Sequence, residues 1–263
     1  MDLYQNRIVV KVGTSTLTNE IGQNDLRSFD RLAYVLSDIQ NNGYEVVLVS
    51  SGAIAIGANK LKMKTKPASL RLKQASAAVG QCRIMFLYDK FFGEYDKTIA
   101  QILLSVDDIE HEEKKENLTN TFNSLLEMGV IPVVNENDSI SYTEIQSDER
   151  LFSDNDMLSA VVAILCKAKK LIILSDIDGF YDSDPRLHPT AKRIERIDNI
   201  NESIYSLAGG AGSRRGTGGM RTKLQAAALT MNNGIDTIIA NGNHPENLYA
   251  VLDGKSVGTL FKG

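Results

Sequence analysis

The sequence predicts an α/β protein, a three-layer αβα sandwich with a mostly parallel central sheet. Two observations carry this prediction. Short runs of β-branched and other apolar residues alternate along the 263-residue chain with longer segments of helical spacing. The short runs are apolar at nearly every position, as expected for strands that helices cover on both faces. Alternation of this kind favours parallel strands joined by helices.

Six apolar runs are predicted to form the sheet: 7–12, 45–50, 98–105, 130–135, 170–175 and 236–240. Five segments with apolar residues three and four positions apart are predicted to be helices: 24–42, 67–92, 107–128, 154–167 and 219–233. For the first helix, Asn24 is the expected N-cap and Gly43 the expected stop. A further helix is expected to begin after the serines at 50 and 51.

The composition is that of an ordinary globular protein. A net charge of −4 argues against broad electrostatic binding of nucleic acid or of an anionic membrane. The first residues lack the pattern of a signal peptide, and no segment is apolar for the roughly 18 residues of a membrane span. We therefore expect a cytoplasmic protein. Cys82 and Cys166 lie in apolar sequence without a Cys-x-x-Cys spacing, and both are expected to be buried and unreactive.

The chain is predicted to form a single domain over residues 1–263. No linker or internal repeat divides it, and a seam between two lobes is expected near 168–170. The charged run 107–117 is interpreted as a solvated helix face. The aspartates between 176 and 184 lack the order of a calcium loop, so no metal site is predicted there.

Polar residues follow several predicted strands at the point where each strand ends. They are Lys11 and Gly13, then Ser50 to Gly52, then Asn135 to Asp138, and finally Ser175 and Asp176. Because the carboxyl ends of parallel strands share one edge, where ligands bind in open α/β sheets, these loops are predicted to form one site. Each has a simpler interpretation on its own: helix caps for the two serines, a turn for 135–138, and a surface lysine for Lys11.

Six glycines lie between Ala208 and Met220, and Lys223 follows just inside a predicted helix. Backbone amides without side chains can approach phosphate oxygens closely, and a helix N-terminus adds partial positive charge. The sequence therefore predicts a phosphate site here. A flexible surface loop is the alternative, but it does not explain the lysine and the helix that follow at once. The phosphate-binding motif GxxxxGK[ST] is absent, because Tyr249 stands at its first glycine.

Six motifs, in this order, resemble those of the amino acid kinase family: "KVGTSTL", "VSSGAIAIG", "NENDSI", "DNDMLSA", "LSDIDGFYDSDPR" and "GTGGMRTKLQAA". The resemblance covers nearly the whole chain, and it is strongest to the members that act on L-glutamate. It implies an amino acid kinase-like fold and ATP-dependent phosphorylation of the γ-carboxylate of L-glutamate to L-glutamyl 5-phosphate, the first step of proline biosynthesis. Many members add a C-terminal PUA domain, which this chain is expected to lack.

The family's functional positions carry over onto matching residues. By this resemblance, Lys11 and Lys223 flank the transferred phosphoryl group, and Asp156 holds both lysines in place. Glutamate-binding positions match Ser51, Gly52, Asp138 and Asn155. ATP-binding positions match Lys11, Gly13, Ser175, Asp176, Thr217, Gly218, Gly219, Met220, Arg221, Thr222 and Lys223. Ser175 stands where the family commonly has threonine, and the hydroxyl is retained. The amino acid is assigned to the lobe at about 1–168 and the nucleotide to the lobe at about 169–263.

The chemistry of the residues agrees with this function. A glutamate side chain has a pKa of about 4.3, so the nucleophile is ionised at neutral pH and no general base is needed. His111, His188 and His244 all lie outside the motifs. The difficulty is repulsion between two anions, about 4 kcal/mol at 4 Å for an effective dielectric constant near 20. Two lysines, and Mg²⁺ held mainly through the ATP phosphates, would offset it.

Two alternatives remain open at this point. An acetylglutamate, aspartate, carbamate or uridylate kinase would have the same fold. "NENDSI" followed by "SDNDMLSA" favours glutamate, but these side chains alone would also hold another small amino acid. A non-catalytic sensor of an amino acid and a nucleotide belongs to another class, but it predicts the loss of Lys11 or Lys223, and both are present. The resemblance further implies inhibition by proline, a homo-oligomer (dimer or tetramer), and transfer of the product to glutamate-5-semialdehyde dehydrogenase.

Overall fold

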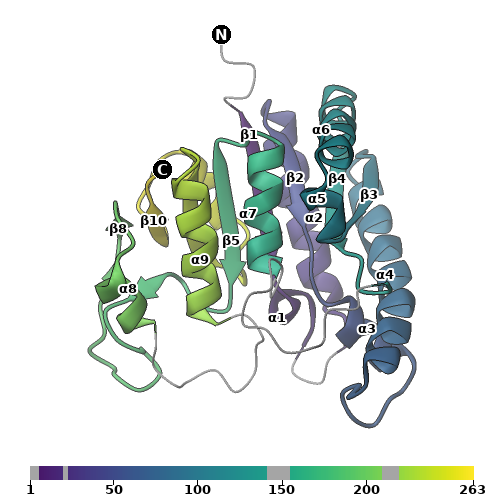
Figure 1. The fold of residues 1–263 in the computed structure, drawn as a ribbon, viewed down its shortest axis with the longest axis horizontal. Helices are drawn as coiled ribbons and strands as arrows, with labels where there is room; N and C mark the ends of the chain where they lie inside the picture. The colour runs from purple at the N-terminus through teal and green to yellow at the C-terminus, as the bar shows by residue number, and fades with distance from the viewer. Residues whose placement is uncertain (1–5, 20–22, 141–154, 209–218) are drawn as a thin grey trace.

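A computed structural model of the protein describes residues 6–19, 23–140, 155–208 and 219–263. Within this part of the chain, eight strands form one sheet (Figure 1). Their order across the sheet is β3 (Ile99–Leu104), β4 (Ile131–Glu136), β2 (Glu45–Val49), β1 (Arg7–Val12), β5 (Lys170–Ser175), β9 (Asp236–Asn241), β10 (Thr259–Phe261) and β8 (Arg196–Ile197). Neighbouring strands are parallel except for β10, which pairs antiparallel with β9. The predicted α/β class with a mostly parallel central sheet is confirmed.

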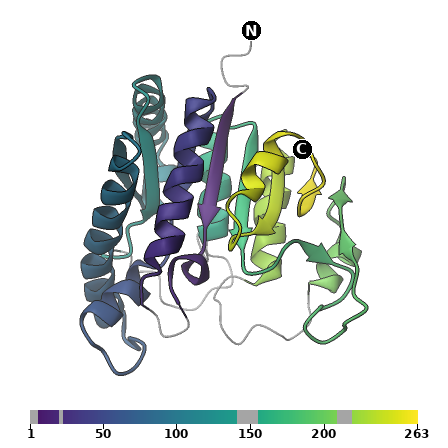
Figure 2. The ribbon, with the colours of Figure 1, turned by 180° about the vertical axis from the view of Figure 1, so that it is seen from behind.

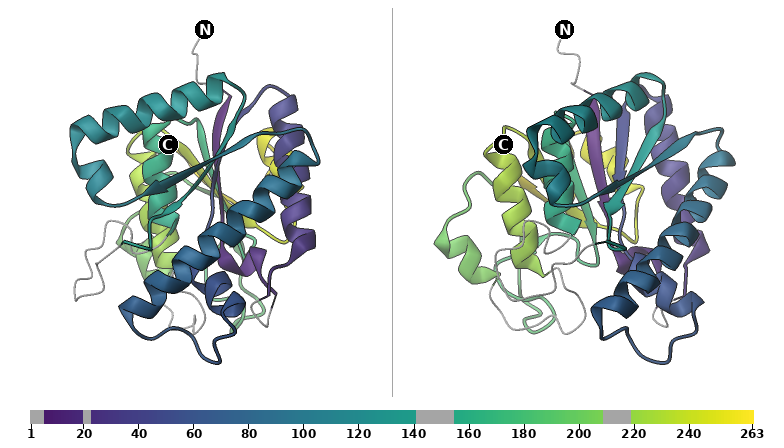
Figure 3. Two further views of the ribbon diagram at one scale, coloured as in Figure 1. Left: turned by 90° about the vertical axis from the view of Figure 1, so that its right-hand side faces the viewer. Right: turned by 45° about the vertical axis from the view of Figure 1, so that its right-hand side comes forward.

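Helices cover both faces of the sheet, which gives three layers (Figures 1, 2 and 3). One face carries α1 (Thr14–Leu17), α2 (Leu26–Asn41), α3 (Ala53–Lys60), α4 (Leu70–Gly93) and α10 (Asn247–Leu252). The other carries α6 (Glu112–Glu127), α7 (Asn155–Leu165) and α9 (Met220–Met231). Two short helices, α5 (Asp107–Glu110) and α8 (Glu202–Leu207), and a small hairpin of β6 (Phe180–Tyr181) and β7 (Arg193–Ile194) complete the described elements. The two faces have separate apolar cores.

Strand β1 shows how the sheet directs one functional side chain. Successive side chains of a strand point to opposite faces. Ile8, Val10 and Val12 pack in the core beneath α2 and α4, whereas Val9 packs in the core beneath α7 and α9. Lys11 has the parity of Val9, so its side chain lies on the α7 and α9 side.

Helices α3 and α4 pack in very close contact, and glycine makes this possible. A Cβ atom on Gly57 would lie 1.7 Å from the carbonyl oxygen of Ser76, and one on Gly80 would lie 1.8 Å from that of Ala53. Real Cβ atoms cannot approach so closely. The glycines therefore let α3 pack directly against the first half of α4.

All six predicted strands are present, with ends within one residue of the predicted ones. The sequence did not reveal the short strands β6, β7, β8 and β10. The predicted helix 107–128 is two helices, α5 and α6, because His111 adopts an extended backbone between them. Gly43 follows the end of α2 with φ of 87°, as its predicted stop.

Two local predictions are wrong. Helix α2 is capped by Asp25, whose side chain accepts from the backbone N–H groups of Arg27 and Ser28, and not by Asn24. Cys82 is exposed on α4 and does not belong to the apolar core of that face. Cys166 is buried as expected, and burial raises the pKa of its thiol to about 12. None of the described helices has both the length and the apolar character needed to cross a bilayer.

Candidate active site

The carboxyl ends of three central strands meet at one edge of the sheet. Lys11 of β1 is paired in register with Val49 of β2 on one side and with Ile173 of β5 on the other. Strand β1 has β2 as its neighbour on one side and β5 on the other, so the strand order reverses here. Open α/β sheets bind ligands at such a switch point. Lys11 therefore lies at this crevice, because its strand β1 is in the centre of the sheet.

Two lysines from distant parts of the chain reach one carboxylate. The ammonium nitrogen of Lys11 lies 2.6 Å from Asp156 Oδ1, and that of Lys223 lies 2.9 Å from Asp156 Oδ2. Asp156 occupies the first turn of α7, and Lys223 occupies the first turn of α9. The Asp156 side chain is 0% exposed and both lysine side chains are below 10%. The structure thus brings the three predicted catalytic residues together in one buried cluster.

Electrostatics keep Asp156 ionised in this cluster. Burial alone would raise the pKa of its carboxyl group, but the ammonium groups of Lys11 and Lys223 outweigh burial and hold that pKa below its ordinary value. The carboxylate in turn fixes where the two positive charges lie. Two cations aimed at one region are the arrangement that stabilises a transferring phosphoryl group.

The N-terminus of α9 presents backbone N–H groups beside the lysines. Its N-cap is Gly219, which has no side chain to cover the first amides, those of Met220 and Arg221. The Thr222 N–H donates to the Gly219 carbonyl at 3.2 Å. The Thr222 hydroxyl lies 2.8 Å from the carbonyl oxygen of Gly219 and 3.3 Å from Asp156 Oδ2. This end of the helix can accept an anion. Thr217 and Gly218, also predicted to bind nucleotide, lie outside the described residues.

Asn155, the neighbour of Asp156, organises the second part of the site. Its Nδ2 lies 2.9 Å from the backbone carbonyl of Ser50, 2.8 Å from Ser51 Oγ and 3.1 Å from Asn135 Oδ1. Because Ser51 Oγ accepts a hydrogen bond from Asn155, the hydroxyl proton of Ser51 points away from Asn155. The Ser50 hydroxyl is 3.0 Å from the buried hydroxyl of Tyr88 on α4. Asn155 therefore joins α7 to the ends of β2 and β4.

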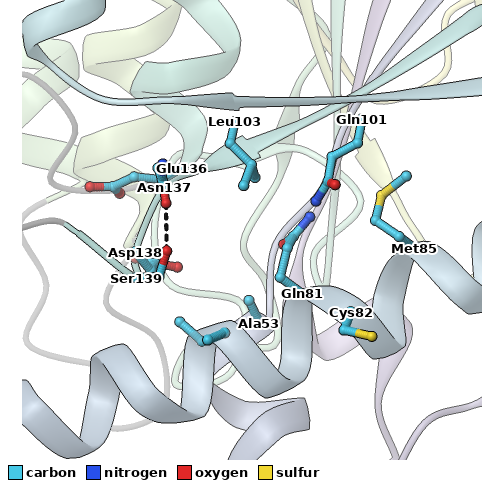
Figure 4. A pocket seen from close by; sticks show the side chains of 12 residues that line it. Ala53, Gln81, Cys82, Met85, Gln101, Leu103, Glu136, Asn137, Asp138 and Ser139 are labelled. Atoms are coloured by element: carbon cyan, nitrogen blue, oxygen red, sulfur yellow. Dashed lines mark hydrogen bonds between the residues drawn. The ribbon is translucent and has the colours of Figure 1, made fainter.

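Asp138 lies beyond the end of β4, in the wall of a cavity of about 490 Å³. The cavity lies between the ends of β3 and β4 and helices α3 and α4 (Figure 4), and it is lined by Ala53, Ala77, Ala78, Gln81, Cys82, Met85, Gln101, Leu103, Glu136, Asn137, Asp138 and Ser139. Burial raises the pKa of Asp138 to about 6. A cationic group beside Asp138 would stabilise its ionised form.

The predicted glycines shape two loops of the site. Gly52 precedes α3 with φ of 98°, a conformation that favours glycine, and a Cβ atom there would lie 3.2 Å from the Thr14 side chain. Gly13 is the N-cap of α1, directly after β1. A Cβ atom on Gly13 would lie 3.9 Å from the ammonium nitrogen of Lys11, so glycine leaves space beside that group.

Ser175 and Asp176 lie at the end of β5, and they differ in environment. Ser175 is buried, whereas the Asp176 side chain is exposed and pairs with Arg186 at 3.1 Å. The Ser175 hydroxyl lies 3.2 Å from Asp176 Oδ1. Among the described residues, no group of three or more His, Cys, Asp or Glu side chains is arranged to hold a metal ion.

The structure adds two residues that the sequence did not indicate, Gln81 and Tyr88, both on α4. Gln81 Oε1 is 2.8 Å from Asn135 Nδ2, and Tyr88 contacts Ser50. In the sequence both lie inside a regular helical pattern with no motif around them. Only the packing of α4 against the strand ends brings them to the site.

Comparison with known proteins gives a consistent result. The family model described as "Amino acid kinase family" matches residues 6–241. The chain is 57% identical to the glutamate 5-kinase of Clostridium perfringens (strain 13 / Type A) and 47% identical to that of Enterococcus faecalis (strain ATCC 700802 / V583). Each alignment covers 97% of this chain and 94% of the relative. Among solved structures, carbamate kinase from Giardia lamblia bound to AMP-PNP shares the fold, with a TM-score of 0.69, 17% identity and 98% of each chain covered.

Proposed function

This chain belongs to the amino acid kinase family, and from that premise we propose that it transfers the γ-phosphoryl group of ATP to the γ-carboxylate of L-glutamate. The product is L-glutamyl 5-phosphate, and the step is the first of proline biosynthesis. The observation that carries the proposal is the convergence of Lys11 and Lys223 on Asp156. High identity to glutamate 5-kinases over 97% of the chain supports glutamate as the acceptor.

Phosphoryl transfer here needs alignment and charge, not proton transfer. One oxygen of the γ-carboxylate attacks the terminal phosphorus, the bond to the bridging oxygen breaks, and ADP leaves with that electron pair. The nucleophile is already ionised, so no base takes a proton. Lys11 and Lys223 offset the repulsion between the two anions and the charge that develops on the phosphoryl oxygens. Asp156 keeps the two ammonium groups in place during the reaction.

The nucleotide is proposed to lie against the C-terminal half of the sheet. The uncovered amides of Met220 and Arg221 suit its phosphates, with Gly13 leaving room beside Lys11. Ser175 and Asp176 line the same edge at the end of β5. Residues 169–263 would then form the nucleotide lobe and 1–168 the amino-acid lobe.

Mg²⁺ is proposed to act with the nucleotide. When bound, it neutralises phosphate charge and so makes the attack of a second anion easier. The residues present fit an ion held mainly by phosphates, because the described carboxylate nearest the lysines, Asp156, already pairs with both of them.

The amino acid is proposed to occupy the region between Ser51 and Asp138. Asp138 would pair with the α-ammonium group. Burial raises the pKa of Asp138, and the positive charge of the substrate would favour its ionised form. Ser51 and Asn155 would orient the substrate near Lys11, and Gly52, which packs against Thr14, would supply the turn from Ser51 into α3. Inhibition by proline, a dimeric or tetrameric assembly, transfer of the product to glutamate-5-semialdehyde dehydrogenase and a cytoplasmic location stay predictions.

The test is ADP release, measured by a coupled assay with L-glutamate, N-acetylglutamate, aspartate and carbamate as separate acceptors. We expect turnover with L-glutamate to exceed that with the others by at least about 100-fold. Hydroxylamine added to the reaction converts an acyl phosphate to a hydroxamate, which identifies the product class. A preference for another acceptor, or ADP release without hydroxamate, would contradict the proposal.

A further inference from the structure

The side-chain amides of Asn155, Asn135 and Gln81 form a chain of hydrogen bonds with one direction. Asn155 Nδ2 donates to the backbone carbonyl of Ser50 at 2.9 Å, and a carbonyl can only accept. This contact decides which end of the Asn155 amide is the nitrogen. The same nitrogen lies 3.1 Å from the side-chain oxygen of Asn135.

The same order of donor and acceptor continues from Asn135 to Gln81. Because the oxygen of Asn135 accepts from Asn155, its nitrogen faces the other way and donates to Gln81 Oε1 at 2.8 Å. Asn135 is 1% exposed, so the relay lies in the interior. With its oxygen engaged, Gln81 must turn its Nε2 group, with two N–H donors, away from Asn135.

Gln81 and Asp138 line the same cavity. Figure 4 shows the amide nitrogens of Gln81 and Gln101 pointing toward one another on one side of this space, and Asp138 on the other. Gln101 is exposed on β3, and no hydrogen bond to another described residue holds its side chain. Of these two glutamines, Gln81 is therefore the one whose amide orientation the fold itself sets.

We propose that Gln81 binds the α-carboxylate of the amino acid substrate and determines specificity for it. This assignment rests on the proposed function. A free α-amino acid carries an ammonium group and a carboxylate on one carbon atom. Asp138 complements the first and the Gln81 amide complements the second. A site built to hydrogen-bond a substrate group rejects analogues that lack it, because its own polar group is then left without a partner.

The decisive variant is Gln81→Glu. The new side chain keeps an oxygen that can accept from Asn135, so the relay can persist. It loses both N–H donors and places negative charge beside the α-carboxylate. We expect the KM for L-glutamate to rise by about 10-fold or more, with kcat changed by less than about 3-fold.

Two substrate analogues separate binding from structural support. Glutarate keeps the α-carboxylate position but lacks the amino group, and 4-aminobutyrate keeps the amino group but lacks that carboxylate. Gln81→Glu is expected to weaken the binding of glutarate as much as that of L-glutamate. The binding of 4-aminobutyrate is expected to change by less than about 3-fold. KM is measured by coupled ADP release at pH 8, where Asp138 is ionised. For an analogue that is not turned over, the inhibition constant against L-glutamate is measured in place of KM. Gln225→Glu, exposed on α9, controls for the added charge.

The outcomes are distinct. A KM for L-glutamate within about 2-fold of the wild-type value would overturn the assignment. Equal weakening of L-glutamate binding and 4-aminobutyrate binding would also overturn the assignment, because Gln81 would then only support the structure of the site. Wild-type protein that forms no hydroxamate from L-glutamate would reject the proposed function itself, and this assignment with it.

Discussion

The carboxylate of Asp156 lies 2.6 Å from the ammonium nitrogen of Lys11, where solvent reaches neither group appreciably. One residue earlier in α7, Asn155 holds Ser51 at 2.8 Å. Two consecutive side chains at the start of one helix thus position the phosphoryl-transfer end and the amino-acid end of the candidate site. The two ends can be disturbed separately by substitution.

Loss of either lysine is expected to impair the chemical step. Lys11→Ala or Lys223→Ala removes one of two cations that stabilise the transition state, so kcat is expected to fall by roughly 10²-fold or more. The KM for L-glutamate is expected to change less. Lys255→Ala is the matched control, because Lys255 is exposed and pairs only with its neighbour Asp253 among the described residues. Turnover within threefold of wild type for both active-site variants would contradict these roles.

Asp156→Asn tests the carboxylate between the lysines. This change removes the negative charge that two buried ammonium groups share, and removing one partner of a buried pair typically costs about 3–5 kcal/mol of unfolding free energy. The pKa of Asp156 is lowered by folding, so its contribution is present above the unfolded pKa and is lost as pH falls through the folded one. Urea unfolding of both proteins at several pH values measures this. Equal stability at pH 7 would contradict the ion-pair assignment.

Asp138 is expected to control the pH dependence of glutamate binding. Its pKa is raised to about 6 by burial, and only the ionised form can pair with the α-ammonium group. The KM for L-glutamate is therefore expected to rise as pH falls below about 6. Asp138→Ala is expected to raise the KM above pH 6, where the wild-type residue is ionised, and to differ less from wild type near pH 5. KM profiles between pH 5 and 8 check this. An Asp138→Ala protein with the wild-type KM would contradict the assignment.

The same residue is expected to reduce stability. A carboxyl group whose pKa is higher in the folded state costs folding free energy at any pH where it is ionised, and the cost disappears below its unfolded pKa. Asp138→Asn is thus expected to stabilise the free protein by about 2–3 kcal/mol at pH 7.5 and to have little effect near pH 4. Urea unfolding at the two pH values measures the difference. A destabilised variant at pH 7.5 would show that Asp138 has a structural partner.

Contact between α3 and α4 is expected to be essential for the cavity. Gly80→Ala places a methyl group against the carbonyl of Ala53, which lines the cavity with Gln81, so the helices must separate. Overpacking of this kind costs roughly 1–3 kcal/mol, and the KM for L-glutamate is expected to rise with it. Gly93→Ala at the end of α4 meets nothing within 4 Å and serves as the control. Thermal unfolding and KM together decide the outcome.

Much of the fold was predictable because the strands are apolar on both faces. The run at 7–12 matches β1 in full, and Lys11 stands out as a charge within it. Asn24 and Asp25 could both cap a helix, and the choice between them depends on where the chain leaves α1. Strand β10 has three residues, and it is defined by its pairing with β9 and not by its own pattern.

The site was predictable only where a motif marks it. Lys11, Asp156 and Lys223 each lie in a stretch with recognisable neighbours, and the fold brings them together. Gln81 gave no such signal, because a glutamine inside a helix is usually a solvated surface residue. Its position depends on Gly80, which lets α4 approach α3, and on Asn135, which is buried at the end of another strand.

Strand β1, which carries Lys11, lies between two hydrogen-bonded neighbours, β2 and β5. Its backbone amides can exchange with deuterium only when the middle of the sheet opens, which in most proteins requires the whole molecule to unfold. The reactive cation is therefore anchored on the last part of the molecule to lose its order. Loss of activity on heating is expected to follow global melting of the protein, with no earlier local event at this lysine.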